Sequence, residues 1–159
     1  MALSRTSEVA HRPTARLRVW DTCAYIRGLS DRAIGGTISS DLRRGRFLLV
    51  GVVAMELHAG ARDAATTRAL GALALNLAGL GLLHVPDFSD YRLVGVALAQ
   101  YRNRHGAIEP ARHFRDALIA ACAARRAADI VTDNVRDLER WVTWLRMRPA
   151  PRVIATDDA

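Results

Sequence analysis

The sequence contains no lysine, so all 23 of its basic residues are arginines. They outnumber 16 acidic residues and give a formal net charge of +7. A positive surplus of this size favours a polyanionic partner such as a nucleic acid. Because a basic set made only of arginine is also typical of compositional bias in the source genome, both interpretations stay open.

Long apolar runs and secretory features are also lacking. The longest apolar stretch, residues 69–85, is interrupted by Asn76 and several glycines, whereas a membrane span needs roughly 18–20 apolar residues in succession. Residues 1–16 are charged throughout, which predicts a disordered tail without a secretory signal. Only two cysteines occur, Cys23 and Cys122, without metal-type spacing. They favour free thiols in a reducing compartment, so we expect a cytoplasmic protein that does not enter the membrane.

Short apolar segments alternate with segments of helical periodicity along the chain. Strands are predicted at residues 17–20, 47–53, 80–85 and 128–132, with a last edge strand inside 144–154. Helices are predicted at residues 22–44 with an interruption at Gly35 and Gly36, and at 54–60, 64–77, 89–104, 114–126 and 135–142. The segment 47–53 lacks polar alternation, which is typical of a strand buried on both faces of a parallel sheet.

This alternation predicts an α/β fold. We expect a three-layer α/β/α sandwich around a mostly parallel central sheet of four to five strands. A chain of 159 residues with 50% hydrophobic content is long enough for one domain with a real core. We place that single domain at residues 17–155.

Acidic residues stand where the predicted strands end. Asp21 follows the first strand, Glu56 the second, and Asp133 and Asp137 the fourth, while Asp116 opens the preceding helix. Each one alone has an ordinary explanation as a helix cap or first-turn acid, worth about 1 kcal/mol or less. Ligands of open α/β sheets bind at the carboxyl ends of strands. Because clustered carboxylates need a neutralising cation, the set predicts a site for a hard divalent metal.

Four segments in this order resemble the PIN domains, and among these the toxin ribonucleases of the VapC type. They are DTCAYI, AMELHAGA, RDALIAACA and VTDNVRDLERW, and the resemblance spans residues 17–141. It implies an endoribonuclease that hydrolyses RNA phosphodiester bonds with Mg²⁺, or with Mn²⁺ as a substitute. It also implies the role of toxin in a toxin–antitoxin pair, a homodimer, and a small antitoxin protein that covers the active-site groove.

The resemblance also assigns catalytic positions. Its three acids fall on Asp21, Glu56 and Asp116, of which Asp21 and Asp116 are the expected metal ligands. Glu56 would be a ligand or would orient the attacking water. The fourth polar position falls on Asn134, with Asp137 three residues later, and these two would complete the outer part of the site.

The chain departs from the family pattern at a few positions. Asn134 stands where an acid is also common, so Asp133, Asn134 or Asp137 could fill the fourth position. Cys23 replaces a small hydroxyl residue, and Leu138 replaces a frequent aromatic residue. These departures leave an alternative function open, that of a catalytically inactive PIN-fold protein that binds or scaffolds.

Candidate RNA contacts are weaker signals. Arg112 and Arg115 precede the third acid, and arginine suits bidentate contact with phosphate. Thr22 and Thr132 at the predicted strand ends could bind a phosphate oxygen or a carboxylate. A solvated loop and ordinary helix caps explain the same residues equally well.

Two other classes gather acids at strand ends. A phosphoacceptor domain of the receiver type needs paired acids after the first strand and a late lysine, but Asp21 stands alone and lysine is absent. A phosphatase with an aspartate nucleophile usually has a second aspartate two residues later, where this chain has Cys23. Both classes are therefore disfavoured.

Overall fold

The computed structural model describes residues 16–159 and contains one fully parallel sheet with strand order β3-β2-β1-β4-β5. The strands are β1 (Arg18–Trp20), β2 (Phe47–Val50), β3 (Leu83–His84), β4 (Asp129–Thr132) and β5 (Val153–Ala155). The helices are α1 (Thr22–Ser30), α2 (Arg32–Arg43), α3 (Gly51–Gly60), α4 (Ala64–Gly79), α5 (Phe88–His105), α6 (Pro110–Arg125), α7 (Val135–Leu145) and the short 3-10 helix η1 (Thr156–Asp158). The predicted α/β sandwich with a parallel sheet of four to five strands is confirmed.

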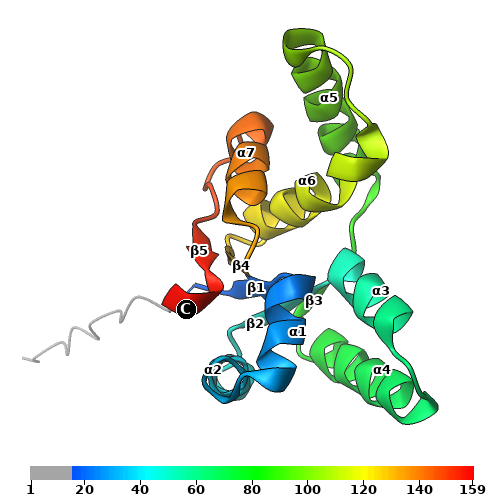
Figure 1. The fold of residues 1–159 in the computed structure, drawn as a ribbon, viewed down its shortest axis with the longest axis vertical. Helices are drawn as coiled ribbons and strands as arrows, with labels where there is room; N and C mark the ends of the chain where they lie inside the picture. The colour runs from blue at the N-terminus through cyan, green and yellow to red at the C-terminus, as the bar shows by residue number, and fades with distance from the viewer. Residues whose placement is uncertain (1–15) are drawn as a thin grey trace, which may run out of the picture.

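The strand order distributes the helices over both faces of the sheet. The chain runs outward from β1 through β2 to β3, then crosses back to β4 and continues to β5. Because crossovers between parallel strands are almost always right-handed, the helices α1 to α4 cover one face and α5 to α7 the other. Figure 1 shows α5, α6 and α7 together in the upper part of the view and α2 and α4 in the lower part, with the strands between them.

The strands β1 and β4 are neighbours whose connections leave in opposite directions. β1 continues to β2 on one side, and β4 continues to β5 on the other. A crevice forms at the carboxyl ends of such a strand pair. Trp20 is paired with Val131, and the N–H of Asp21 donates to the carbonyl of Val131 at 2.9 Å. The residues that follow β1 and β4 are therefore brought side by side.

The helix α6 is the central element of its layer. Its residues Ala117–Ala124 are all buried, and most of them are alanine. Small side chains let α6 pack closely between the sheet and its neighbours α5 and α7. The last side chain before this buried stretch is that of Asp116, so packing of α6 fixes its position at the edge of the sheet.

The second strand is shorter than predicted. Only Phe47–Val50 are extended, and Gly51 begins α3, so Glu56 lies in the second turn of the helix and not in its first. A Cβ atom at Gly51 would lie 3.3 Å from Cδ of Pro86 and 3.6 Å from Cα of Val85. The glycine thus allows the segment after β3 to pass close to the start of α3, a contact that the apolar pattern does not encode.

Two helix boundaries also differ from the prediction. The interruption expected at Gly35 and Gly36 lies at Asp31, whose carboxylate caps α2 by accepting from the N–H groups of Ala33 and Ile34 at 2.9 and 3.2 Å. The helix α6 begins at Pro110, because proline fits the first helical position. Asp116 therefore lies in the second turn of α6 and does not open the helix.

The described residues extend past both predicted ends of the domain, residues 17 and 155. The predicted tail, residues 1–16, lies outside the described residues except for Arg16, whose guanidinium pairs with Asp129 at 2.9 Å. Past the predicted boundary at residue 155 the chain continues through η1, in which Thr156 is buried. Over residues 16–159, no helix combines the length and the apolar character that crossing a bilayer requires.

Candidate active site

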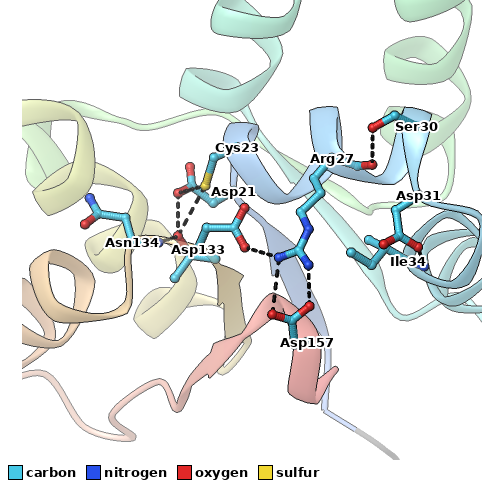
Figure 2. Close-up of polar contacts among 10 residues, drawn as sticks. Asp21, Cys23, Arg27, Ser30, Asp31, Ile34, Asp133, Asn134 and Asp157 are labelled. Atoms are coloured by element: carbon cyan, nitrogen blue, oxygen red, sulfur yellow. Dashed lines mark hydrogen bonds and ion pairs between the residues drawn. The ribbon is translucent and has the colours of Figure 1, made fainter.

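Asp21 lies at the carboxyl end of β1 and is only 7% exposed. It is the N-cap of α1, where its Oδ1 accepts from the N–H of Thr22 at 2.7 Å. Its Oδ2 accepts from Oγ1 of Thr132 at 2.7 Å and from Sγ of Cys23 at 3.2 Å. Figure 2 shows Cys23 directed at the Asp21 carboxylate. The helix start and the end of β4 together hold this carboxylate in one orientation.

Glu56 reaches the same edge from α3. Its Oε2 accepts a short hydrogen bond from the hydroxyl of Thr22, and its Oε1 pairs with Nη1 of Arg115 on α6. The side chain of Glu56 is 15% exposed, whereas that of Arg115 is 56% exposed. Glu56 is therefore held from both sides, by a residue adjacent to Asp21 and by a residue adjacent to Asp116.

The pKa of Asp116 is raised, in part by the negative charges of the other acids. Its pKa is raised to about 6, first by burial and then by the charges of Asp21, Asp137 and Glu56, while Arg115 acts in the opposite direction. A carboxylate shifted by burial and by like charges is typical of functional sites. The four acids thus form one electrostatic cluster, in which, over residues 16–159, only Glu56 and Asp137 are paired with arginines, Arg115 and Arg140.

The loop after β4 adds a polar side chain to this cluster. The N–H of Asn134 donates to Oγ1 of Thr132 at 2.9 Å, and its side-chain Nδ2 donates to Oδ2 of Asp116 at 3.3 Å. Asp137 follows in the first turn of α7, where it also pairs with Arg140 at 2.7 Å. Two of the three candidates for the fourth position therefore interact with Asp116. Asn134 donates a hydrogen bond to its carboxylate, and Asp137 raises its pKa.

Asp133, the third candidate for that position, is engaged elsewhere. Its carboxylate pairs with Nη1 of Arg27 at 3.0 Å, and the same guanidinium binds Asp157. Figure 2 shows Arg27 between these two carboxylates. The pairs join residues 106 and 130 positions apart in sequence, so no local pattern could have revealed them. In this arrangement Asp133 is paired with Arg27, and it is not among the charges that raise the pKa of Asp116.

The predicted RNA contacts divide into two groups. The hydroxyls of Thr22 and Thr132 each donate their one proton to a carboxylate, so we assign both residues to positioning the acids. Arg112 is exposed and has no ion-pair partner among residues 16–159, and Arg115 is partly exposed beside Glu56. Both arginines lie on the first two turns of α6, next to the acidic edge.

The donor set fits Mg²⁺ in a particular way. Over residues 16–159, no three of these carboxylates bring oxygen atoms within 4.8 Å of one another. Mg²⁺ keeps several waters and needs only one or two carboxylates together with substrate phosphate oxygens. The open spacing of Asp21, Glu56 and Asp116 suits such partial coordination better than a closed protein cage.

The sheet order and the acids at its carboxyl edge define the class of this protein, the PIN-type α/β sandwiches. A chain in the crystal structure of DNA-bound VapBC from Salmonella typhimurium shares the fold, with a TM-score of 0.57. The two are 21% identical, and the match covers 89% of this chain and 99% of that chain.

Comparison with curated sequences identifies the family within this class. The VapC ribonuclease Mb1587 of Mycobacterium bovis is 35% identical over 117 residues, which are 70% of this chain and 81% of the relative. Ribonuclease VapC11 of Mycobacterium tuberculosis matches with the same identity and coverage. No protein-family model matches the chain. The chain belongs to the VapC ribonuclease family, and the predicted resemblance is confirmed.

Proposed function

We propose that this chain is an endoribonuclease that hydrolyses RNA phosphodiester bonds with Mg²⁺ or Mn²⁺ and acts in the cytoplasm as the toxin of a toxin–antitoxin pair. The observation that carries the proposal is the convergence of Asp21, Glu56 and Asp116 at one edge of the sheet, with the pKa of Asp116 raised to about 6. The names of the VapC relatives and of the VapBC neighbour support the same activity and partner.

The residues have distinct roles in this proposal. Asp21 and Asp116 would hold the cation, which when bound would supply neutralisation of phosphate charge and an activated water. Glu56, fixed by Thr22 and Arg115, would orient the attacking water and accept its proton at a carboxylate oxygen. The exposed part of Arg115 offers further N–H groups to a phosphate of the RNA.

Cleavage of a structured RNA pool by the purified chain tests the proposal. We expect cutting with Mg²⁺ or Mn²⁺, no cutting with EDTA, and a loss on the order of 100-fold or more in Asp21→Asn and Asp116→Asn. Circular dichroism shows whether these variants stay folded. Cutting that persists in EDTA, or in both folded variants, would refute the proposed site.

Asn134 favours a second candidate function, that of a PIN-fold protein that binds RNA without cutting it. An amide at this position removes one negative charge from the cation site, although Asp137 lies near enough to act on Asp116. Calorimetry with Mg²⁺ and a gel-shift assay with RNA separate the two functions. Binding of both, with no cleavage by the folded wild type, would support the non-catalytic candidate.

The antitoxin partner has a suitable surface close to the acids. An apolar groove lies between α1, α3 and α4, lined mainly by Tyr25, Ile26, Leu29, Leu57, Leu70 and Leu73. Ile26 and Leu29 are 51% and 74% exposed. Because Asp21 caps the start of α1 and α3 carries Glu56, an apolar helix of the antitoxin in this groove would reach the active-site edge. We propose this groove as the antitoxin site.

We assign the homodimer to a different apolar surface. Met55, Val85, Phe88 and Tyr91 are 58%, 65%, 80% and 47% exposed, and three of them line a groove with Phe114 between α3, α5 and α6. A cluster of exposed apolar side chains of this kind marks an interaction site. Light scattering should give a dimer for the wild type and a monomer for Phe88→Arg, whereas a monomeric wild type would contradict this assignment.

A further inference from the structure

A second group of metal-ligating side chains lies apart from the acidic edge. His84 ends β3, Asp90 lies in the first turn of α5, and Cys122 lies in α6. Cys122 is six positions after Asp116 (122 minus 116), which is about 9 Å along the helix axis. One nitrogen, one oxygen and one sulfur atom of these three residues all lie within 4.8 Å of one another.

The ligand atoms are buried, and one has no other partner. Asp90 and Cys122 are 0% exposed, and the side chain of His84 is 14% exposed. Nε2 of His84 is buried, makes no hydrogen bond to any described residue, and lies 3.4 Å from Oδ2 of Asp90. A buried ring nitrogen without a partner is unfavourable. A cation bound between this nitrogen, the carboxylate of Asp90 and the thiol of Cys122 would give the nitrogen a partner.

The carboxylate of the group is oriented from outside. Oδ1 of Asp90 accepts from Nε of Arg125 at 2.5 Å, and Oδ2 accepts from the N–H of Asp87 at 3.0 Å. Such outer hydrogen bonds are typical of carboxylates that bind metals, because they fix the orientation of the ligand. They also leave Oδ2 with room for one further contact on the side of His84.

The chemistry of the three atoms selects the kind of ion. Thiolate sulfur, imidazole nitrogen and carboxylate oxygen are the ligands of zinc, whereas Mg²⁺ takes oxygen alone. Zinc–ligand bonds of about 2.0–2.3 Å in a tetrahedron place the ligand atoms roughly 3.3–3.8 Å apart. The separation of 3.4 Å between Nε2 of His84 and Oδ2 of Asp90 already lies in this range, and the three ligand atoms all lie within 4.8 Å of one another. A water molecule would be the fourth ligand.

We propose that His84, Asp90 and Cys122 form a binding site for a zinc-class divalent cation, separate from the site of RNA hydrolysis. The ion would tie the two-residue edge strand β3 to α5 and α6. A network of Arg125, Asp90 and His84 without any metal is the competing explanation. In that network Cys122 is only a buried side chain of the hydrophobic core and binds no ion, so cysteine chemistry separates the two.

Cobalt is the probe, since a Co²⁺–thiolate bond gives a charge-transfer absorption band. The full chain without a histidine tag is treated with a chelator and titrated with Co²⁺. We expect one equivalent bound with the band in the wild type, and the same band in Cys23→Ala and in Asp116→Asn. The band should be absent from Cys122→Ala, and binding should be at least about tenfold weaker in His84→Gln.

Zinc then provides a readout that does not depend on colour. Zn²⁺ should raise the Tm of the wild type and of Cys23→Ala more than that of His84→Gln. His84 is partly exposed, so this variant keeps the test valid if Cys122→Ala fails to fold. No charge-transfer band in the wild type, or a band that disappears with Cys23 and persists without Cys122, would overturn the proposal.

Discussion

The hydroxyl of Thr132 donates a 2.7 Å hydrogen bond to Oδ2 of Asp21, a residue 111 positions away in sequence. Oγ1 of Thr132 in turn accepts from the N–H of Asn134 at 2.9 Å. Thr132 is fully buried at the end of β4, next to the end of β1. One side chain therefore couples the first acid of the site to the loop that supplies the fourth polar position.

Removal of that hydroxyl should weaken the site without removing an acid. Thr132→Val keeps the shape of the side chain but removes the hydroxyl, which leaves the Cys23 thiol as the one side-chain donor to Oδ2 of Asp21 among the described residues. We expect a 10–100-fold loss, on the order reported for outer hydrogen bonds of metal ligands, in Mg²⁺ affinity or cleavage rate. The measurement is the Mg²⁺ concentration that gives half-maximal RNA cleavage.

Thr132→Ser is the matched control, because it restores the donor and loses only a methyl group. It should need nearly the same Mg²⁺ concentration as the wild type. Equal Mg²⁺ dependence of the valine and serine variants would contradict a positioning role for the hydroxyl.

The raised pKa of Asp116 predicts how stability depends on pH without metal. Its pKa is about 6 in the folded chain against an ordinary value of 3.8, because of burial and then of the charges on Asp21 and Asp137. Between these values the folded state binds more protons than the unfolded state, so the contribution of Asp116 to the free energy of unfolding falls as pH rises. It is fully present below about pH 4 and lost above about pH 6.

Melting curves between pH 4 and pH 7 in EDTA measure this effect. As pH rises across this interval, the Tm of the wild type should fall relative to that of Asp116→Asn, since the amide does not titrate. Mg²⁺ should reduce the shift, because a bound cation neutralises the carboxylate. A difference that is independent of pH would contradict the raised pKa.

The convergence of the acids at one edge could be predicted because it follows from the backbone. In a parallel sheet all carboxyl ends lie at one edge, so acids such as Asp21 and Asp137 that follow apolar runs must approach one another. Asp116 approaches them because α6 is buried between the sheet and two helices. This expectation needed only the positions of the strands, which the apolar pattern gives. It did not need the order of the strands in the sheet.

The contacts around the acids could not be predicted in the same way. The pair of Arg27 with Asp133 and the bond from Thr132 to Asp21 join residues more than 100 positions apart, and they depend on side-chain packing. The group of His84, Asp90 and Cys122 has no motif spacing, because each residue comes from a different element. The start of α3 at Gly51 was missed since an apolar segment can continue from strand into helix without a change in composition.

Asp41 provides a test of the structural framework away from the site. It is fully buried and accepts from Nε1 of Trp20 at 3.1 Å, and its carboxylate pairs with Arg46 and, at 3.4 Å, with Arg18. Asp41→Ala leaves these donors without their acceptor. We expect a loss of about 3 kcal/mol in the free energy of unfolding, measured by urea denaturation with tryptophan fluorescence.

Asp41→Asn should be less harmful, because the amide oxygen still accepts from Trp20 while the ion pairs are lost. As an external reference, Asp31→Ala removes only the cap of α2 and should lower stability by about 1 kcal/mol. If Asp41→Ala cost no more than Asp31→Ala, the buried carboxylate would have no special structural role.

Arg112 and Arg115 lie three residues apart on α6 and have different surroundings. Their variants should therefore separate RNA binding from catalysis. Arg115→Ala removes the partner of Glu56, so we expect a loss mainly in the cleavage rate of bound RNA. Arg112→Ala removes an exposed charge, so we expect weaker RNA binding, a salt dependence reduced by about one phosphate contact, and an unchanged rate at saturating RNA. Single-turnover kinetics at several salt concentrations measure both quantities. A rate loss in Arg112→Ala equal to that in Arg115→Ala would mean that both arginines act alike on phosphate, and that Glu56 does not depend on Arg115 for its orientation.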